Sequence, residues 1–308
     1  MSLSEEQRVL RHALRRCEVR SVMPGHDAEL WSLLRGQIGV AGLMIPECHG
    51  GTGSGLAAVQ LVMEELGRIL APVPMLATIL ATQALLCLDN NGARERLLPR
   101  IAAGEVTPAL IWGEHVPDAD IADVLLLLDG DKLSEVDGAR CRQLTTMDPT
   151  RRLCTVDISE AELRPLGRTD PTAVRDLACA ALAAEQVGGA ARCLELTVQY
   201  TSRRVQFGRA IGSFQALQHR MADLHVLVET ARSAALAATT PTRAAIAKVH
   251  CSEVYQRVAA EMIQLHGGIA ITWEHDAHLY FKRAHGSAHL FGTPAEHLAR
   301  IGEVLLTG

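Results

Sequence analysis

The residues best suited to ligand chemistry lie in the stretch RRVQFGRAIGSFQ, residues 203–215. Arg204 carries a planar guanidinium that can contact two phosphate oxygens at once. Gly208 and Gly212 bracket a short irregular loop, and Gln215 falls in the first turn of the helix that follows, where free backbone N–H groups attract anions. These residue types in this order indicate a nucleotide site. The alternative is a polar corner between two helices.

A second candidate lies further along the chain, in QLHGG, residues 264–268. Gln264 places a side-chain amide beside Gly267 and Gly268, and glycine lets a ligand approach the backbone closely. This stretch therefore also suits a nucleotide.

Three other patterns are weaker evidence for a functional site. PECHGGTGSG, residues 46–55, is rich in glycine, but Leu56 stands where GxGxxG needs its last glycine, so we expect a tight turn between helices. His285 and His289 are four residues apart without the third ligand that zinc needs, so we expect no metal. The adjacent pair Glu64–Glu65 cannot face one site from a helix, and we expect both carboxylates to be solvated.

Composition excludes several classes of protein. Of 308 residues 48% are hydrophobic, 21% charged and 3% aromatic, which indicates a globular protein richer in helix than in sheet. The net charge of -5 without a long basic run excludes a nucleic-acid partner. The eight cysteines lack any CxxC spacing, the N-terminus has no apolar signal core, and no apolar run is long enough to cross a bilayer. We expect a soluble, cytoplasmic protein with reduced thiols and no membrane partner.

Periodicity in the first half of the chain predicts helices and then strands. Residues 57–70 are amphipathic, and residues 76–88 are apolar nearly all round, as a buried helix requires. The continuous apolar run 124–128 and the segment 152–158 predict strands, within a small β unit between Leu110 and Gly167.

Helix resumes at Asp170–Pro171, a cap followed by a first-turn proline. Further helices are predicted from about residue 213, after Thr240–Pro241, and over roughly 274–290, with a short one closing the chain. The pattern predicts a mostly α protein with an N-terminal helical domain (1–108), a small β domain (109–168) and a C-terminal antiparallel four-helix bundle (169–308).

The chain resembles the acyl-CoA dehydrogenase family over nearly its whole length and in the right order. YTSRRVQFGRAIGSFQALQHRMADLH (200–225) and QLHGGIAITWEHDAHLYFKRA (264–284) resemble its C-terminal helical domain. IPECHGGTG (45–53), VMEELGR (62–68) and LLPRIAAGE (97–105) resemble its N-terminal helical domain. The resemblance implies a middle β domain, assembly as a dimer of dimers, and FAD at a subunit interface.

The resemblance also implies roles for particular residues. The FAD pyrophosphate region would be held by Arg204, Gln206, Phe207 and Gln215. The adenosine half would be lined by Gln264, Gly267 and Gly268. In the family these groups reach across the interface to the flavin of the neighbouring subunit.

Two groups that serve a subunit's own flavin are absent. The middle domain is reduced, because the turn that packs against the isoalloxazine ring is missing after IWGEH, residues 111–115. Most members place the catalytic Glu before a late Gly-Thr, where this chain has Phe291. The alternative place for that Glu, on the first helix of the bundle, falls at Ala178, and the nearest acids are Asp176 and Glu185.

The sequence therefore predicts a non-catalytic subunit of an α2β2 acyl-CoA dehydrogenase, the arrangement of heteromeric members known from actinobacterial sterol side-chain breakdown. A full-length catalytic partner would hold most of the CoA thioester, such as that of a steroid side chain, and the isolated chain would be inactive. One alternative is a self-sufficient dehydrogenase whose base is Asp176 or Glu185. Another is a flavin-free structural homologue.

Overall fold

The computed structural model of the chain describes residues 4–19 and 25–307. It divides into two compact units, one made of residues 1–62 and 71–181, the other of residues 63–70 and 182–308. The fold is mostly α, with an N-terminal helical part, a small β part and a C-terminal helical bundle, which confirms the predicted fold class. Domain boundaries at residues 108 and 168 stay predictions.

Helices begin the first unit. They are α1 (Glu5–Arg15), α2 (Ala28–Leu33), the start of α3 (Gly55–Arg68), α4 (Met75–Leu86) and α5 (Asn91–Ala102). The Ser4 hydroxyl accepts from the Gln7 N–H at 3.2 Å and the Gln7 side chain accepts from the Ser4 N–H at 3.1 Å, so a capping box opens α1. The expectation of a buried helix over 76–88 is confirmed by α4, which is buried along nearly its whole length.

The β part contains two small sheets. One has the order β1 (Pro108–Ile111), β3 (Val124–Asp129), β4 (Lys132–Asp137), β7 (Glu162–Arg168), and only the β1–β3 pair within it is parallel. The other has the order β2 (Val116–Pro117), β6 (Leu153–Asp157), β5 (Arg140–Gln143) and is antiparallel. Leu125 and Leu127 pack against a cluster that includes residues of both sheets, while Leu126 and Leu128 are buried on the opposite face, as alternation along a strand requires.

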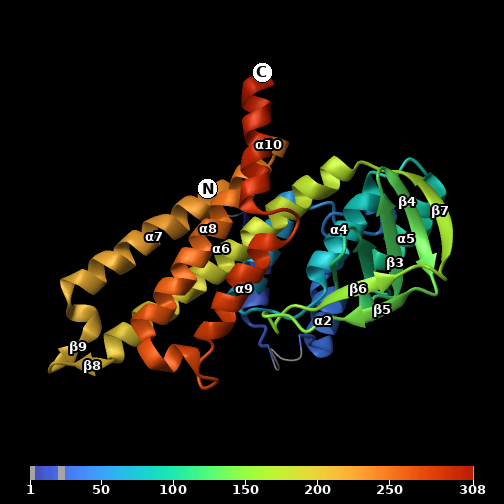
Figure 1. The fold of residues 1–308 in the computed structure, drawn as a ribbon. Helices are drawn as coiled ribbons and strands as arrows, with labels where there is room; N and C mark the ends of the chain where they lie inside the picture. Colours follow the sequence, from blue (N-terminus) through green and yellow to red (C-terminus); the bar gives the residue numbers. More distant parts are fainter. Residues whose placement is uncertain (1–3, 20–24, 308) are drawn as a thin grey trace. The chain divides into compact units, whose positions relative to one another are not determined.

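The second unit is a helical bundle. It holds the later part of α6 (Pro171–Arg203), then α7 (Gln215–Leu236), α8 (Pro241–His266), α9 (Ala277–His289) and α10 (Pro294–Thr307). α8 packs against α7, α9 and α10, and α7, α8 and α9 lie side by side (Figure 1). The Asp170 carboxylate accepts from the N–H groups of Thr172 at 2.8 Å and Ala173 at 3.2 Å, which confirms the predicted cap of α6.

Arg–Glu pairs cluster where the end of α3 meets the bundle, within α3, between α3 and the bundle helices, and between α6 and α9, and we call them the Arg–Glu seam. Glu64 and Glu65 are only 8% and 4% exposed, so the expectation that they are solvated is wrong. Their helix turns both carboxylates toward arginines: Glu64 pairs with Arg232 of α7, and Glu65 lies 3.6 Å from Arg68. The members of the seam are Glu64, Glu65, Arg68, Glu185, Glu195, Arg232 and Arg283.

Glycines allow the same helices to approach closely. A Cβ at Gly188 of α6 would overlap the carbonyl oxygen of Glu64, and a Cβ at Gly67 would overlap that of Glu185. Only glycine therefore fits these two positions.

A buried lysine stabilises the end of α9. Lys248 of α8 is fully buried, and its ammonium donates to the carbonyl oxygens of Ser287 at 3.3 Å and Ala288 at 2.9 Å, and to the Ser252 hydroxyl at 3.2 Å. A positive charge at the C-terminal carbonyls of a helix is favourable.

Candidate functional site

The first predicted stretch forms a two-residue hairpin after α6. Strands β8 (Val205–Gln206) and β9 (Arg209–Ala210) pair with Gln206 opposite Arg209, which leaves Phe207 and Gly208 as the loop. The hairpin is anchored at Arg204, whose N–H donates to the Tyr200 carbonyl at 2.8 Å and whose carbonyl accepts from the Ile211 N–H at 2.8 Å. The side chains of Arg204 and Gln206 are exposed.

The N-terminus of α7 follows this hairpin directly. Phe214 is the N-cap residue, and no side chain caps the helix there. Gln215 is the first helical residue, and its side chain is exposed. An uncapped helix N-terminus presents N–H groups and a positive partial charge, which suits an anion.

The second predicted stretch ends α8. Gln264 is exposed in the last turn, and Gly267 has φ 68° and ψ -146°, which glycine alone adopts readily. A Cβ at Gly267 or at Gly268 would meet no atom within 4 Å, so open space lies beside this backbone.

The fold brings the two stretches together through stacked rings. The Tyr200 and His266 rings lie 4.4 Å apart at 23°, which connects the end of α6 to the end of α8. In Figure 1 the β8–β9 hairpin and the connection between α8 and α9 lie at the same end of the bundle. We call this region the open end.

His266 is a buried hydrogen-bonding group at the open end. It is 4% exposed, and its Nδ1 lies 2.8 Å from the Met262 carbonyl oxygen and so donates to it. Nε2 is then an acceptor, and it has no hydrogen-bond partner among the described residues. Burial lowers the pKa of His266 below its usual value, the bond to Met262 raises it, and His275 lowers it, so the ring is neutral near pH 7.

The sequence did not single out the side chains that surround these residues. The Arg209 guanidinium lies over the Phe214 ring, 3.9 Å from its centroid, and the Phe207 and Phe214 rings meet edge to face at 6.2 Å. Trp273 is 69% exposed and has Lys282 over its ring at 4.8 Å. The sequence signal that could have indicated them is FGR, residues 207–209, in which Phe and Arg lie close together shortly before the helix that begins at Gln215.

The positions at which the family resemblance would place a catalytic base, and the acids nearest to them, offer no free carboxylate. Phe291 has φ 59° and Ala178 is fully buried, and neither side chain can accept a proton. Glu185 is 6% exposed and pairs with Arg283, whose Nη1 lies 3.2 Å from its Oε1, so this carboxylate is buried and already has a cationic partner. Asp176 is half-buried, with Oδ1 3.8 Å from the Nε of Arg175.

The β part has few residues from which to build the turn that packs against the isoalloxazine ring in the family, which we call the ring cradle. β1 and β3 are neighbours in one sheet and pair in parallel, and only residues 112–123 connect them. Parallel neighbours need a crossover of about a dozen residues, so this connection is near the minimum length.

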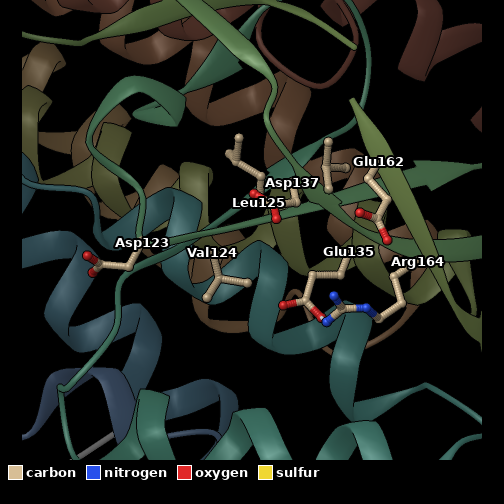
Figure 2. A pocket seen from close by; sticks show the side chains of 8 residues that line it. Asp123, Val124, Leu125, Glu135, Asp137, Glu162 and Arg164 are labelled. Carbon is tan, nitrogen blue, oxygen red and sulfur yellow. Dashed lines mark ion pairs between the residues drawn. The ribbon is translucent and has the colours of Figure 1, made fainter. Parts of the chain in front are cut away.

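A separate cavity of about 230 Å³ opens beside β3, β4 and β7 (Figure 2). Its walls carry Asp123, Glu135, Asp137 and Glu162, and Glu135 lies 3.6 Å from Arg164. Walls with this excess of carboxylates repel phosphate groups, so the cavity does not suit FAD or CoA.

Two structural classes of site have no support in the described part of the chain. No group of three or more His, Cys, Asp or Glu side chains within residues 4–19 and 25–307 could hold a metal ion. Of the helices described, none is long and apolar enough to cross a membrane.

Family profiles match both helical parts of the chain. The profile "Acyl-CoA dehydrogenase, N-terminal domain" matches residues 4–105, and the profile "Acyl-CoA dehydrogenase, C-terminal domain" matches residues 176–306. The chain belongs to the acyl-CoA dehydrogenase family, whose members are oxidoreductases that act on CH–CH bonds and whose cofactor is FAD.

Individual members of the family are similar to this chain over most of its length. The chain is 50% identical over 281 residues to "Acyl-CoA dehydrogenase IpdE2" of Mycobacterium tuberculosis, covering 90% of this chain and 86% of that protein. It is 44% identical over 313 residues to IpdE2 of Mycolicibacterium smegmatis, covering 97% and 98%. Among solved structures, a variant of the "Tcur3481-Tcur3483 steroid ACAD" superposes with a TM-score of 0.86 at 27% identity, covering 99% of this chain and 97% of the other.

Proposed function

We propose that this chain is a subunit of an α2β2 acyl-CoA dehydrogenase in which it completes the FAD site of a full-length catalytic partner. The observation that carries the proposal is the open end of the bundle. Arginine, glutamine and aromatic side chains are exposed there, while Phe291 and Ala178 stand at the two positions where the family resemblance would place the base.

The residues at the open end fit a dinucleotide. Arg204 and the uncapped start of α7 would bind the pyrophosphate, with Gln206, Phe207 and Gln215 beside it. Gln264 would bind the adenosine half, next to Gly267 and Gly268, where a Cβ would meet no atom within 4 Å. The unpartnered Nε2 of His266 is consistent with a polar group that belongs to the complex.

Exposed apolar side chains at the same end favour a partner subunit. Val205 is 56% exposed, Phe207 92%, Ile271 73% and Trp273 69%. A group of exposed apolar side chains next to polar ligand-binding groups is typical of an interface. The partner would cover them and would supply the ring cradle and the base.

The chemistry would be α,β-dehydrogenation of a CoA thioester. FAD, when bound, supplies the oxidant that takes a hydride from the β-carbon. The partner's carboxylate would take the α-proton, because Glu185 is buried against Arg283 and Asp176 lies beside Arg175. A steroid side chain is the acyl group we favour, since a heteromeric structural relative is described as a steroid ACAD.

A visible absorption spectrum tests the proposal. The chain is purified alone and again after co-expression with a full-length acyl-CoA dehydrogenase. We expect a colourless chain and a yellow complex that oxidises a steroid acyl-CoA. A yellow, active single chain would favour the self-sufficient enzyme and direct attention to Asp176 and Glu185. A stable but colourless complex would favour the flavin-free structural homologue.

A further inference from the structure

The tip of the β8–β9 hairpin has a backbone conformation that its residue disfavours. Phe207 and Gly208 form the two-residue loop with φ 53° and 76°. Two positive φ values in such a loop are those of a type I′ turn, in which Asn-Gly is the favoured pair. Gly208 adopts this conformation without strain, but Phe207 carries a Cβ and does not.

Packing within the chain does not account for this strain. The Phe207 side chain is 92% exposed, so the hairpin gains almost no hydrophobic stabilisation from it. A strained and exposed aromatic residue costs stability in the isolated chain. Its benefit therefore comes from something that covers the ring, as is common for strained residues at binding sites.

The ring of Phe207 contacts one neighbouring side chain, Phe214, and Phe214 in turn contacts Arg209. Phe207 meets Phe214 edge to face, with centroids 6.2 Å apart and planes at 89°. The Arg209 guanidinium carbon lies 3.9 Å from the Phe214 centroid, in the geometry of a cation–π contact. Phe214 is the N-cap residue of α7, so the same stack joins the hairpin tip to the helix start that carries Gln215.

We propose that Arg209 is a positioning residue: stacked on Phe214, it holds the ring of Phe207 in place as an aromatic platform for the bound dinucleotide. The proposal rests on the proposed function and adds a role for two residues, Arg209 and Phe214. Arg209 acts through Phe214 and does not itself bind phosphate. Its role is distinct from that of Arg204, which lies at the base of the hairpin.

A double-mutant cycle on FAD retention separates positioning from direct contact. The yellow complex with the full-length partner is diluted, and free flavin is separated by ultrafiltration and quantified. Arg209→Met should raise the apparent Kd about two- to tenfold. Arg243→Met, an equal loss of charge at an exposed first-turn position of α8, should leave the Kd unchanged.

The cycle is completed in a Phe214→Leu background. If Arg209 acts through Phe214, Arg209→Met should have little further effect there, because the ring it stacks on is absent. An undiminished effect that weakens with salt would mean that Arg209 contacts phosphate, and would overturn the proposal. An unchanged Kd for Arg209→Met in the wild-type background would overturn it equally.

A measurement without flavin tests the geometry itself. The chain has four phenylalanines, so selective labelling of their rings gives a short list of NMR signals. We expect a cross-peak between the Phe207 and Phe214 rings in the isolated chain that Arg209→Met weakens and Arg243→Met does not. Its persistence in Arg209→Met would refute the positioning role. If the cross-peak behaves as expected but the wild-type complex never carries flavin, the failure lies in the proposed function.

Discussion

Arg283 and Arg204 lie in the same helical unit and are used in opposite ways. Arg283, in the Arg–Glu seam, is 3% exposed and pairs with the buried carboxylate of Glu185. Arg204, at the open end, is exposed and forms no ion pair with any described residue. An arginine that already has a buried partner stabilises the fold, and one that is held on a fixed backbone without a partner is available to a ligand.

Glycines differ in the same way between the two regions. Gly188 is a contact glycine, because a Cβ there would overlap the backbone of α3. Gly268 has open space around it. In this bundle the role of an arginine or a glycine therefore depends on the residues around it and cannot be assigned from the residue type alone.

The largest expected effect comes from breaking the buried ion pair. Arg283→Met removes the arginine that pairs with the buried Glu185 carboxylate and should lower the free energy of unfolding by about 3–5 kcal/mol. Urea unfolding of the isolated chain measures this. Arg204→Met should leave unfolding unchanged and instead weaken flavin retention in the complex by about 1.5–3 kcal/mol.

A double variant checks the cause. Adding Glu185→Gln to Arg283→Met also removes the buried negative charge that Arg283 balanced, and should recover part of the loss. Equal unfolding midpoints for Arg283→Met and Arg204→Met would contradict the difference drawn between the two regions.

The glycines give the next largest effect. Gly188→Ala forces α3 and α6 apart and should cost about 3 kcal/mol of stability. Gly268→Ala should change stability little, while its methyl group occupies space that we assign to the adenosine half of FAD. Thermal unfolding of the isolated chain and flavin retention by the complex are measured on both variants, and the opposite pattern would remove Gly268 from the site.

Relief of backbone strain should stabilise the isolated chain slightly. Phe207→Asn places a residue that tolerates positive φ in the hairpin loop and should raise the free energy of unfolding by about 1 kcal/mol. The same variant should retain flavin less well in the complex, because the exposed ring is lost. A variant that is less stable than the wild type would show that Phe207 contributes to the fold and is not strained for binding.

A smaller effect is expected when the pH is lowered: the open end should lose stability at a higher pH than the Arg–Glu seam. The folded pKa of His266 lies below its usual 6.5, so the unfolded chain binds the proton first, and the stability that His266 contributes is lost as pH falls below about 6.5. At Glu195 burial raises the pKa, but Arg68 and Arg192 outweigh it and hold the pKa below the usual 4.5. Its contribution is lost only as pH falls below about 4.5.

Hydrogen exchange measured between about pH 7 and pH 4 checks this order. Amides at the end of α8 should lose protection before those of α6 around Glu195. His266→Gln keeps a donor for the Met262 carbonyl and removes the titration, so it should reduce the early loss. Loss of amide protection at the same pH in both regions would contradict the order assigned to His266 and Glu195.

Much of the fold could be predicted from local signals. The capping box at Ser4, the Asp170–Pro171 start of α6 and the strand at residues 124–128 are each encoded within a few residues, and the structure confirms them. The buried Glu64–Glu65 pair could not be predicted, because its partners Arg232 and Arg68 include one that is distant in the chain. Adjacent helix positions do face different directions, but here both directions lead to arginines.

The candidate site was predictable only in part. Arg204 and the Gly267–Gly268 pair stand out by residue type, and the roles given to them stay predictions. The stack of Arg209 on Phe214 depends on the hairpin with its two-residue loop, which brings the two side chains together. No periodic sequence pattern encodes that contact. The contact between Tyr200 and His266 likewise depends on how two helix ends meet.

The buried ammonium of Lys248 has a practical consequence for mapping the assembly. The chain has three lysines, Lys132, Lys248 and Lys282, and Lys248 is sealed between α8 and α9. Amine-reactive cross-linkers will therefore label this protein through Lys132 in β4 and Lys282 beside Trp273, apart from its N-terminal amine. Lys282 is close to the open end, so a cross-link from it to a partner peptide would report directly which surface of that partner docks there. Labelling at Lys248 would instead report that the bundle has opened.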